Sequence, residues 1–194
     1  MVQRNLKPRL IWLVALAAIA LLAAGSTAGA QAAGIDPALL AKANGGDAAA
    51  QVAVGESYAA GRGVKQDYKL AAEWYQKAAN KGQIEGELHL AALYRDGGKE
   101  FPQDMVQAAA WYLKAADQGD VSAQSTMGTL YSMGQGVEQD YAEAYFWLDL
   151  AAAVKGPKQQ EYAEHRQMMG AHITADELAA VQARAVAWKA AHPR

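Results

Sequence analysis

The feature that most constrains the fold is an eight-residue stretch that the sequence contains almost twice. It reads GRGVKQDY at residues 61–68 and GQGVEQDY at residues 134–141, and a degraded copy, GGKEFPQDM, lies between them at residues 97–105. The copies follow one another at about 36 residues, a period typical of stacked helical repeats. A single such repeat cannot bury its apolar face alone, so neighbouring units must pack against one another.

Each unit begins with a segment that has the pattern of a helix buried on one face. A small residue, an apolar residue, a second small residue and a tyrosine recur at helical spacing. These positions are Ala50, Val54, Gly55 and Tyr58, then Gly86, Leu90, Ala91 and Tyr94, then Ala123, Met127, Gly128 and Tyr131. Glycine within a helix costs about 1 kcal/mol relative to alanine. Its use here predicts the close approach of a second helix.

The repeated stretch itself is interpreted as a helix stop, a turn and a helix start. Glycine just after a helix adopts the left-handed backbone freely, and aspartate is a favoured N-cap. The predicted stops are Gly61, Gly97 and Gly134, the further loop glycines Gly63 and Gly136, and the N-caps Asp67, Asp104 and Asp140. Gln107 and Glu143 are expected to complete reciprocal capping boxes. A phosphate-binding loop is excluded because no strand precedes the stretch and no GxxxxGK[ST] motif follows.

The second helix of each unit carries the segments EWYQKAANKG, AWYLKAADQG and FWLDLAAAVKG. Trp74, Trp111 and Trp147 therefore recur in register, and a pair of alanines follows each of them. A tryptophan stripe can form a platform for a ligand. At this regularity we predict instead that the rings pack against the small residues of neighbouring helices.

The flanking segments are predicted to cap the array. Residues 36–46 form a short leading helix, another helix begins at Pro157 and runs to Gly170, and a last helix follows. In the last helix Thr174 and Glu177 form a capping box, Ile173 and Leu178 a hydrophobic staple, and Leu178, Val181, Ala185 and Trp188 a buried stripe. The predicted segments are a leading segment at 31–46, repeats at 47–82, 83–119 and 120–156, and terminal helices at 157–194.

The N-terminus has the layout of a secretory signal peptide over residues 1–30. Arg4, Lys7 and Arg9 precede the apolar run Leu10–Ala24, and small residues follow at Ala28 and Ala30. An uncleaved membrane anchor is the alternative, but the run is shorter than the roughly 20 residues that span a bilayer. We therefore expect export to the periplasm or the exterior, with membrane contact only through this segment if it is retained.

Composition and motifs give little support for catalysis. The chain has no cysteine, and removal of the three basic residues takes the net charge from −2 to −5, which is unlike a nucleic-acid-binding protein. Neither HExxH nor GxSxG occurs. Glu161 and His165 share a helical face and His172 is close in sequence, but such residues are more often solvated than metal-bound. We expect no enzyme, no metal and no cofactor.

The repeated residues resemble the Sel1-like repeat (SLR) family, which is related to the tetratricopeptide repeats. The shared pattern is A-x-x-x-L-G-x-x-Y, then G-x-G-V, D, A-x-x-W-Y-x-K-A-A and G, over roughly residues 47–156. Unit two departs from it at Gly86, Ala91 and Lys99 and has an extra residue before Asp104, so its loop should bulge. The resemblance implies an all-α fold, a right-handed α-solenoid of antiparallel helix pairs with helical caps.

The same resemblance implies a binding function, because members of the family often act as envelope or secreted adaptors, regulators or toxin inhibitors. The first helix of each pair is then expected to line a concave groove for a protein or peptide partner. The predicted contact residues are Val52, Glu56, Glu85, Leu88, Arg95, Ser125, Thr129 and Ser132. Leu88 is expected to be an exposed apolar anchor between Glu85 and Arg95, which places unit two at the centre of the groove. A cell-wall-directed enzyme, a carbohydrate- or antibiotic-binding protein and an immunity protein against a secreted toxin are the alternatives.

Overall fold

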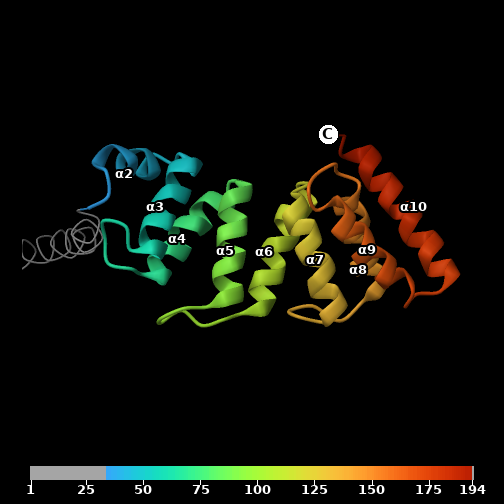
Figure 1. The fold of residues 1–194 in the computed structure, drawn as a ribbon. Helices are drawn as coiled ribbons and strands as arrows, with labels where there is room; N and C mark the ends of the chain where they lie inside the picture. Colours follow the sequence, from blue (N-terminus) through green and yellow to red (C-terminus); the bar gives the residue numbers. More distant parts are fainter. Residues whose placement is uncertain (1–33, 194) are drawn as a thin grey trace, which may run out of the picture.

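The computed structural model describes residues 34–193, and this part of the chain is built from helices connected by loops and turns (Figure 1). The helices are α2 (Pro37–Asn44), α3 (Ala48–Ala60), α4 (Tyr68–Ala79), α5 (Ile84–Asp96), α6 (Met105–Asp117), α7 (Val121–Met133), α8 (Tyr141–Ala152), α9 (Gln159–Gly170) and α10 (Ala175–Ala191). None of these helices is long and apolar enough to cross a membrane. The predicted signal peptide lies outside the described residues.

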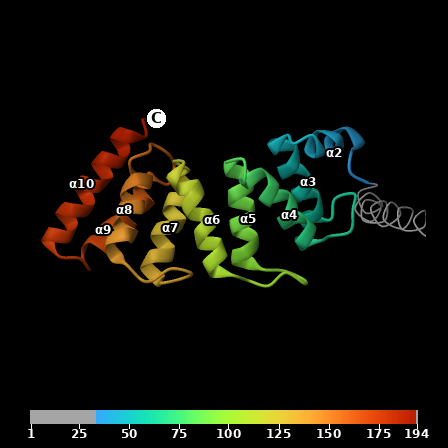
Figure 2. The same ribbon diagram turned by 180° about the vertical axis from the view of Figure 1, so that it is seen from behind.

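The pairs α3–α4, α5–α6 and α7–α8 stand side by side and form the solenoid that the period predicts. Both views show α2 at one end of the array and α10 at the other (Figures 1 and 2). The three long loops within the pairs lie along one edge, and the short turns between pairs lie along the opposite edge. Of the twelve repeated positions of the first helices, all are buried except Tyr94 and Tyr131, which are half-buried.

Two of the three predicted helix stops have the left-handed conformation, and the third departs from it. Gly61 and Gly134 have φ/ψ of 67°/29° and 66°/34°. Gly97 also has a positive φ, but its ψ of −164° leaves the left-handed helical region. The prediction for Gly97 is therefore wrong in conformation. The reason is the bulged second loop, which turns into an antiparallel bridge between Gly98 and Phe101.

The second glycine of the G-x-G stretch, Gly63 in unit one and Gly136 in unit three, has a role that the helix-stop interpretation missed. A Cβ atom at Gly136 would lie 2.0 Å from the carbonyl oxygen of Met105, in the preceding unit. A Cβ atom at Gly63 would lie 2.3 Å from the carbonyl oxygen of Gly34, at the start of the described chain. Each loop thus rests directly on the backbone of the segment before it, and only glycine leaves room for that contact.

The aspartate N-caps are confirmed, but one of the reciprocal partners is used elsewhere. Asp67, Asp104 and Asp140 accept hydrogen bonds from the backbone N–H groups of the first turns of α4, α6 and α8. The capping boxes predicted for Gln107 and Glu143 are both wrong. The Gln107 side chain makes no return bond to the N-cap of α6, and the carboxylate of Glu143 forms an ion pair with Arg184 of α10. The capping box predicted at the start of α10 is present.

The tryptophans of the second helices pack into the structure as predicted. Trp111 and Trp147 are buried, and Trp74 is half-buried at the N-terminal end of the array. The ammonium groups of Lys77 and Lys114 lie 3.8 and 3.6 Å from the ring centroids of Trp74 and Trp111. These cations cover the outer faces of the rings and attract their π electrons, so the tryptophan stripe is part of the scaffold.

The C-terminal helices close the array through polar contacts as well as apolar ones. Asp149 of α8 forms ion pairs with Arg166 of α9 at 2.7 Å and with Lys189 of α10 at 2.9 Å. The predicted stripe of α10 is buried at Val181 and Ala185 and half-buried at Leu178 and Trp188. One carboxylate therefore fastens both terminal helices to the last repeat.

Candidate protein-binding face

The exposed sides of α3, α5 and α7, the first helix of each pair, form the surface on which sequence analysis placed the partner, and α9 lies next to α7 beyond the repeats. We call this surface the first-helix face. The structure corrects the prediction at Val52, which is only 5% exposed and belongs to the core. Leu88 is half-buried and packs against the core, so it is no free apolar anchor. Both side chains pack against the hydrophobic core.

The N-terminal part of the first-helix face carries a polar cluster around Glu56. Its carboxylate lies 3.1 Å from Nη2 of Arg62 and 3.3 Å from Nε2 of His89. The His89 ring stacks on Tyr75 with centroids 4.9 Å apart and planes at 15°. Burial, reinforced by the nearby charge of Glu56, raises the pKa of Tyr75 to about 12. The cluster joins α3, α4 and α5, and the carboxylate of Glu56 is paired with cationic groups of the same chain.

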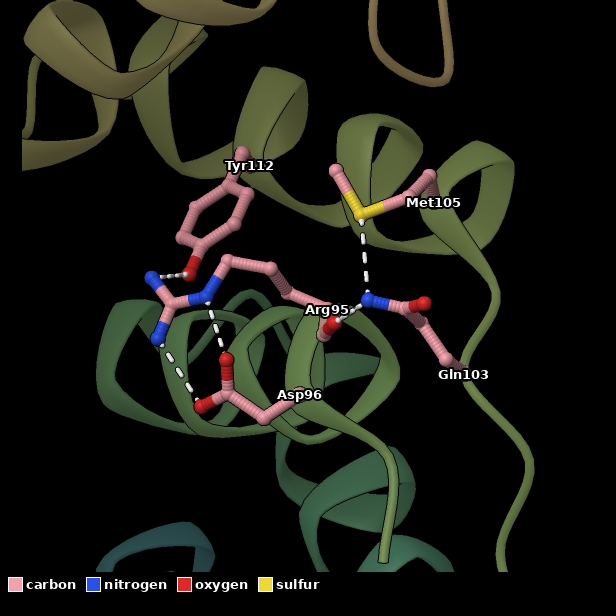
Figure 3. Close-up of polar contacts among 5 residues, drawn as sticks. All are labelled: Arg95, Asp96, Gln103, Met105 and Tyr112. Atoms are coloured by element: carbon pink, nitrogen blue, oxygen red, sulfur yellow. Dashed lines mark hydrogen bonds and ion pairs between the residues drawn. The ribbon is translucent and has the colours of Figure 1, made fainter.

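The middle of the first-helix face carries a second closed cluster, around Arg95 (Figure 3). The guanidinium donates to both carboxylate oxygens of Asp96, at 2.7 and 2.9 Å, and to the hydroxyl of Tyr112 at 3.0 Å. Hydrogen bonding from Arg95 lowers the pKa of Asp96, whereas burial raises the pKa of Tyr112. The amide of Gln103, from the bulged loop, donates to the carbonyl oxygen of Arg95 at 2.6 Å. Arg95 therefore holds the loop and α6 in place.

The C-terminal part of the first-helix face is uncharged along α7. The hydroxyls of Thr129 and Ser132 donate to backbone carbonyls of their own helix, at 3.2 and 2.8 Å. Thr129 is exposed, and Ser125 and Ser132 are half-exposed. On α5, Glu85 is exposed. These four positions agree with the exposure that the sequence predicted.

A pocket that sequence analysis did not anticipate lies beside these hydroxyls, between α7 and α9. Its volume is about 220 Å³. It is lined by Gly128, Thr129, Ser132, Met133, Leu148, His165, Met168 and Met169. Met133 and Met168 are 61% and 51% exposed, which is unusual for side chains of this size and polarity. The flexible thioethers of methionine adapt to apolar groups of different shape, so this pocket is suited to take up an apolar side chain.

The histidines considered as metal ligands are separated by the fold. His165 lines the methionine pocket, whereas the ring of His172 stacks on Tyr141 with centroids 4.5 Å apart. Within residues 34–193, no group of three or more histidine, aspartate or glutamate side chains is arranged to hold a metal ion.

The fold defines a helical repeat protein. The Sel1 repeat model matches residues 48–83, 84–120 and 121–153, which together make up more than half of the chain. The chain therefore belongs to the Sel1 repeat family. No curated protein matches the sequence. Sel1 repeats generally mediate protein–protein interaction and typically form non-enzymatic scaffolds.

Among the solved structures that are similar to this chain, two are compared with it below. A protective antigen present in uropathogenic Escherichia coli strains, which displays an SLR fold, is 33% identical over 78% of this chain, with a TM-score of 0.65. This chain spans 32% of that antigen's length. A Sel1 repeat protein from Oxalobacter formigenes is 31% identical, with a TM-score of 0.56; the match covers 63% of this chain and 92% of that protein.

Proposed function

We propose that this protein is an exported, non-enzymatic binding module that holds a segment of a partner protein in the bacterial envelope against its first-helix face. The observation that carries the proposal is the methionine pocket, a hollow of about 220 Å³ beside exposed Thr129. Exposed methionines that adjoin such a hollow favour contact with another apolar surface. The family's general role in protein–protein interaction supports the same conclusion.

The difference between charged groups that are already paired within the chain and the uncharged surface of α7 suggests where the partner lies. Glu56 and Arg95 are already paired within the chain, so contact with a partner there competes with existing ion pairs. Along α7 the hydroxyls donate hydrogen bonds to backbone carbonyls of their own helix. Apolar groups of a partner can therefore cover them without burying an unpaired charge. Binding is therefore centred on α7 and α9, at the C-terminal end of the face, and not on unit two.

Site-specific photocrosslinking in the producing cell tests this proposal. A photoreactive phenylalanine derivative at Thr129 is expected to give one discrete adduct in the envelope fraction. The matched control places it at Val186 on α10, which is 65% exposed but lies away from the first-helix face. Equal adducts from both positions, or none from Thr129, would contradict binding at this face. Recovery of the adduct only from the cytoplasm would contradict the exported location.

A further inference from the structure

The methionine pocket lies where units one and two place a tyrosine side chain. In the repeat register Tyr75, Tyr112 and Leu148 are equivalent, since each directly follows one of the three repeated tryptophans. A Cβ atom at Gly55 would lie 2.6 Å from the Tyr75 ring, and a Cβ atom at Gly128 would lie 2.6 Å from Cγ of Leu148. The two side chains thus leave their helices toward the same place in their units.

The tyrosine rings in the first two units are occupied by contacts within the chain. Tyr75 stacks on His89 of the following unit, and Tyr112 accepts a hydrogen bond from Arg95 (Figure 3). Both tyrosines are buried. Leu148 is also buried, but its side chain is shorter and has no ring, and the pocket between α7 and α9 opens beside it. The hollow is therefore the space that an aromatic ring fills elsewhere in the array.

We infer that this pocket receives an aromatic side chain of the partner, in place of the ring that the third repeat lacks. The surrounding groups suit an aromatic ring better than an aliphatic one. Methionine sulfur makes favourable contacts with aromatic ring edges, and three methionines line the pocket. The imidazole of His165 lines the same pocket and provides a planar surface for stacking, as His89 does for Tyr75.

The charges next to the pocket determine which residues flank that aromatic side chain. Glu161 and Glu164 are exposed and lie four residues before His165 and Met168 on α9. Residues at this spacing are neighbours on one side of a helix, so each carboxylate lies one helical turn before a side chain that lines the pocket. Glu164 also accepts a hydrogen bond from the amide of Gln160 at 2.9 Å. The nearby cation Arg166 is paired with Asp149 at 2.7 Å. These carboxylates are complementary to a partner segment in which lysine or arginine adjoins the aromatic residue.

A peptide titration followed by NMR of ¹³C-methyl-labelled methionine tests the inference on the protein as isolated from cells. The probe is acetyl-Lys-Tyr-Lys-amide, compared with peptides in which alanine replaces tyrosine or glutamate replaces both lysines. We expect saturable shifts of Met133, Met168 and Met169 that exceed any shift of Met105, which does not line the pocket. Binding of both comparison peptides should be at least about tenfold weaker, since each loses one class of contact. Equal binding of the alanine peptide would overturn the inference.

Two variants connect the titration to the pocket. Leu148→Tyr restores the ring of the first two units, and it is expected to abolish binding with little change in the melting temperature. Met168→Lys, at an exposed position that leaves the fold intact, is expected to weaken binding at least about tenfold by repelling the basic peptide. Val186→Lys is the matched control and should bind as the unmodified protein does. If Leu148→Tyr does not fold, unchanged binding by Met168→Lys still refutes the inference.

The inference rests on the proposed function, and the two can fail separately. A partner that still crosslinks at Thr129 in a folded Leu148→Tyr variant would leave the proposed function intact and exclude the pocket as the aromatic site. Saturable peptide binding without any adduct at Thr129 would show the reverse: an aromatic-binding pocket with no envelope partner at this face.

Discussion

The carboxylate of Glu87 on α5 accepts a hydrogen bond from the side-chain amide of Gln118, the C-cap residue of α6, at 2.7 Å, so the bond joins the two helices of unit two. Glu87 is only 3% exposed, and burial raises its pKa, against the opposing effect of Lys114. At the equivalent positions Gln51 and Gln124 donate to the carbonyl oxygens of Ala43 and Ala116, at 3.1 and 3.2 Å. An ionised carboxylate cannot donate such a bond, so the buried charge at this position destabilises unit two.

Glu87→Gln is therefore expected to stabilise the protein at pH 7, by about 1 kcal/mol, because a neutral amide is less costly to bury and can donate. The folded-state pKa of Glu87 is raised above the ordinary value of 4.5. The contribution of the Glu87 side chain to stability is thus fully present below pH 4.5, where the carboxyl is protonated, and is lost as the pH rises through the raised pKa. The stabilisation of Glu87→Gln relative to the unmodified protein should therefore become smaller as the pH is lowered, as measured by urea unfolding at several pH values. Glu85→Gln, at an exposed site two residues earlier, should have no comparable effect.

Gly136→Ala is expected to destabilise the protein by about 2–4 kcal/mol, since it combines a strained backbone with a clash. Gly136 has φ of +74°, and the added Cβ atom would lie 2.0 Å from a backbone oxygen that cannot move freely. Gly156→Ala is the matched control, because nothing lies within 4 Å of its Cβ position. Thermal unfolding should separate the two variants clearly. Similar melting temperatures would show that the loops do not rest on one another as described.

Gly128→Leu is expected to overpack the contact between α7 and α8 by about 1–3 kcal/mol. The two helices approach closely there, since even a Cβ atom at Gly128 would lie 2.6 Å from Cγ of Leu148. The neighbouring substitution Thr129→Leu, on the exposed side of the same helix, should change stability by less than about 0.5 kcal/mol. A wild-type melting temperature for Gly128→Leu would disprove the requirement for a small residue there.

Asp149→Ala is expected to release α9 and α10 from the last repeat and to cost about 1–3 kcal/mol. Asp149 is 13% exposed in its side chain and pairs with Arg166 and Lys189, so its loss removes two partly buried ion pairs at once. Hydrogen exchange should accelerate more in α10 than in α3. Asp96→Ala removes a carboxylate whose side chain is 61% exposed, and it should have a smaller effect, as most surface pairs do.

Export predicts a mature N-terminus at Gln31, after the small residues Ala28 and Ala30. Mass spectrometry of the periplasmic fraction should find the chain without residues 1–30. Recovery of an intact chain beginning at Met1, in the membrane fraction, would instead identify the apolar run as an anchor.

The sequence by itself determined the class of fold, because the repeat encodes local rules that need no distant partner. Helical spacing of small, apolar and tyrosine positions, glycine after a helix and aspartate before one each act within a few residues, and their recurrence required stacking. For the same reason the capping box of Thr174 and Glu177 was readable in advance. The helices that these signals predicted are the helices that form.

Only the tertiary structure decided which of the positions on the outward sides of the helices are exposed and unpaired. Val52 falls on the outward side of an isolated helix, but in the folded chain it is buried in the hydrophobic core. Arg95 looked available until the fold brought Tyr112 and the bulged loop to it. The methionine pocket depends on α9, which lies beyond the repeats and joins α7 only through packing. Leu148 in place of a tyrosine was the one sequence signal of that pocket, and its meaning required knowing what the tyrosines of the other units touch.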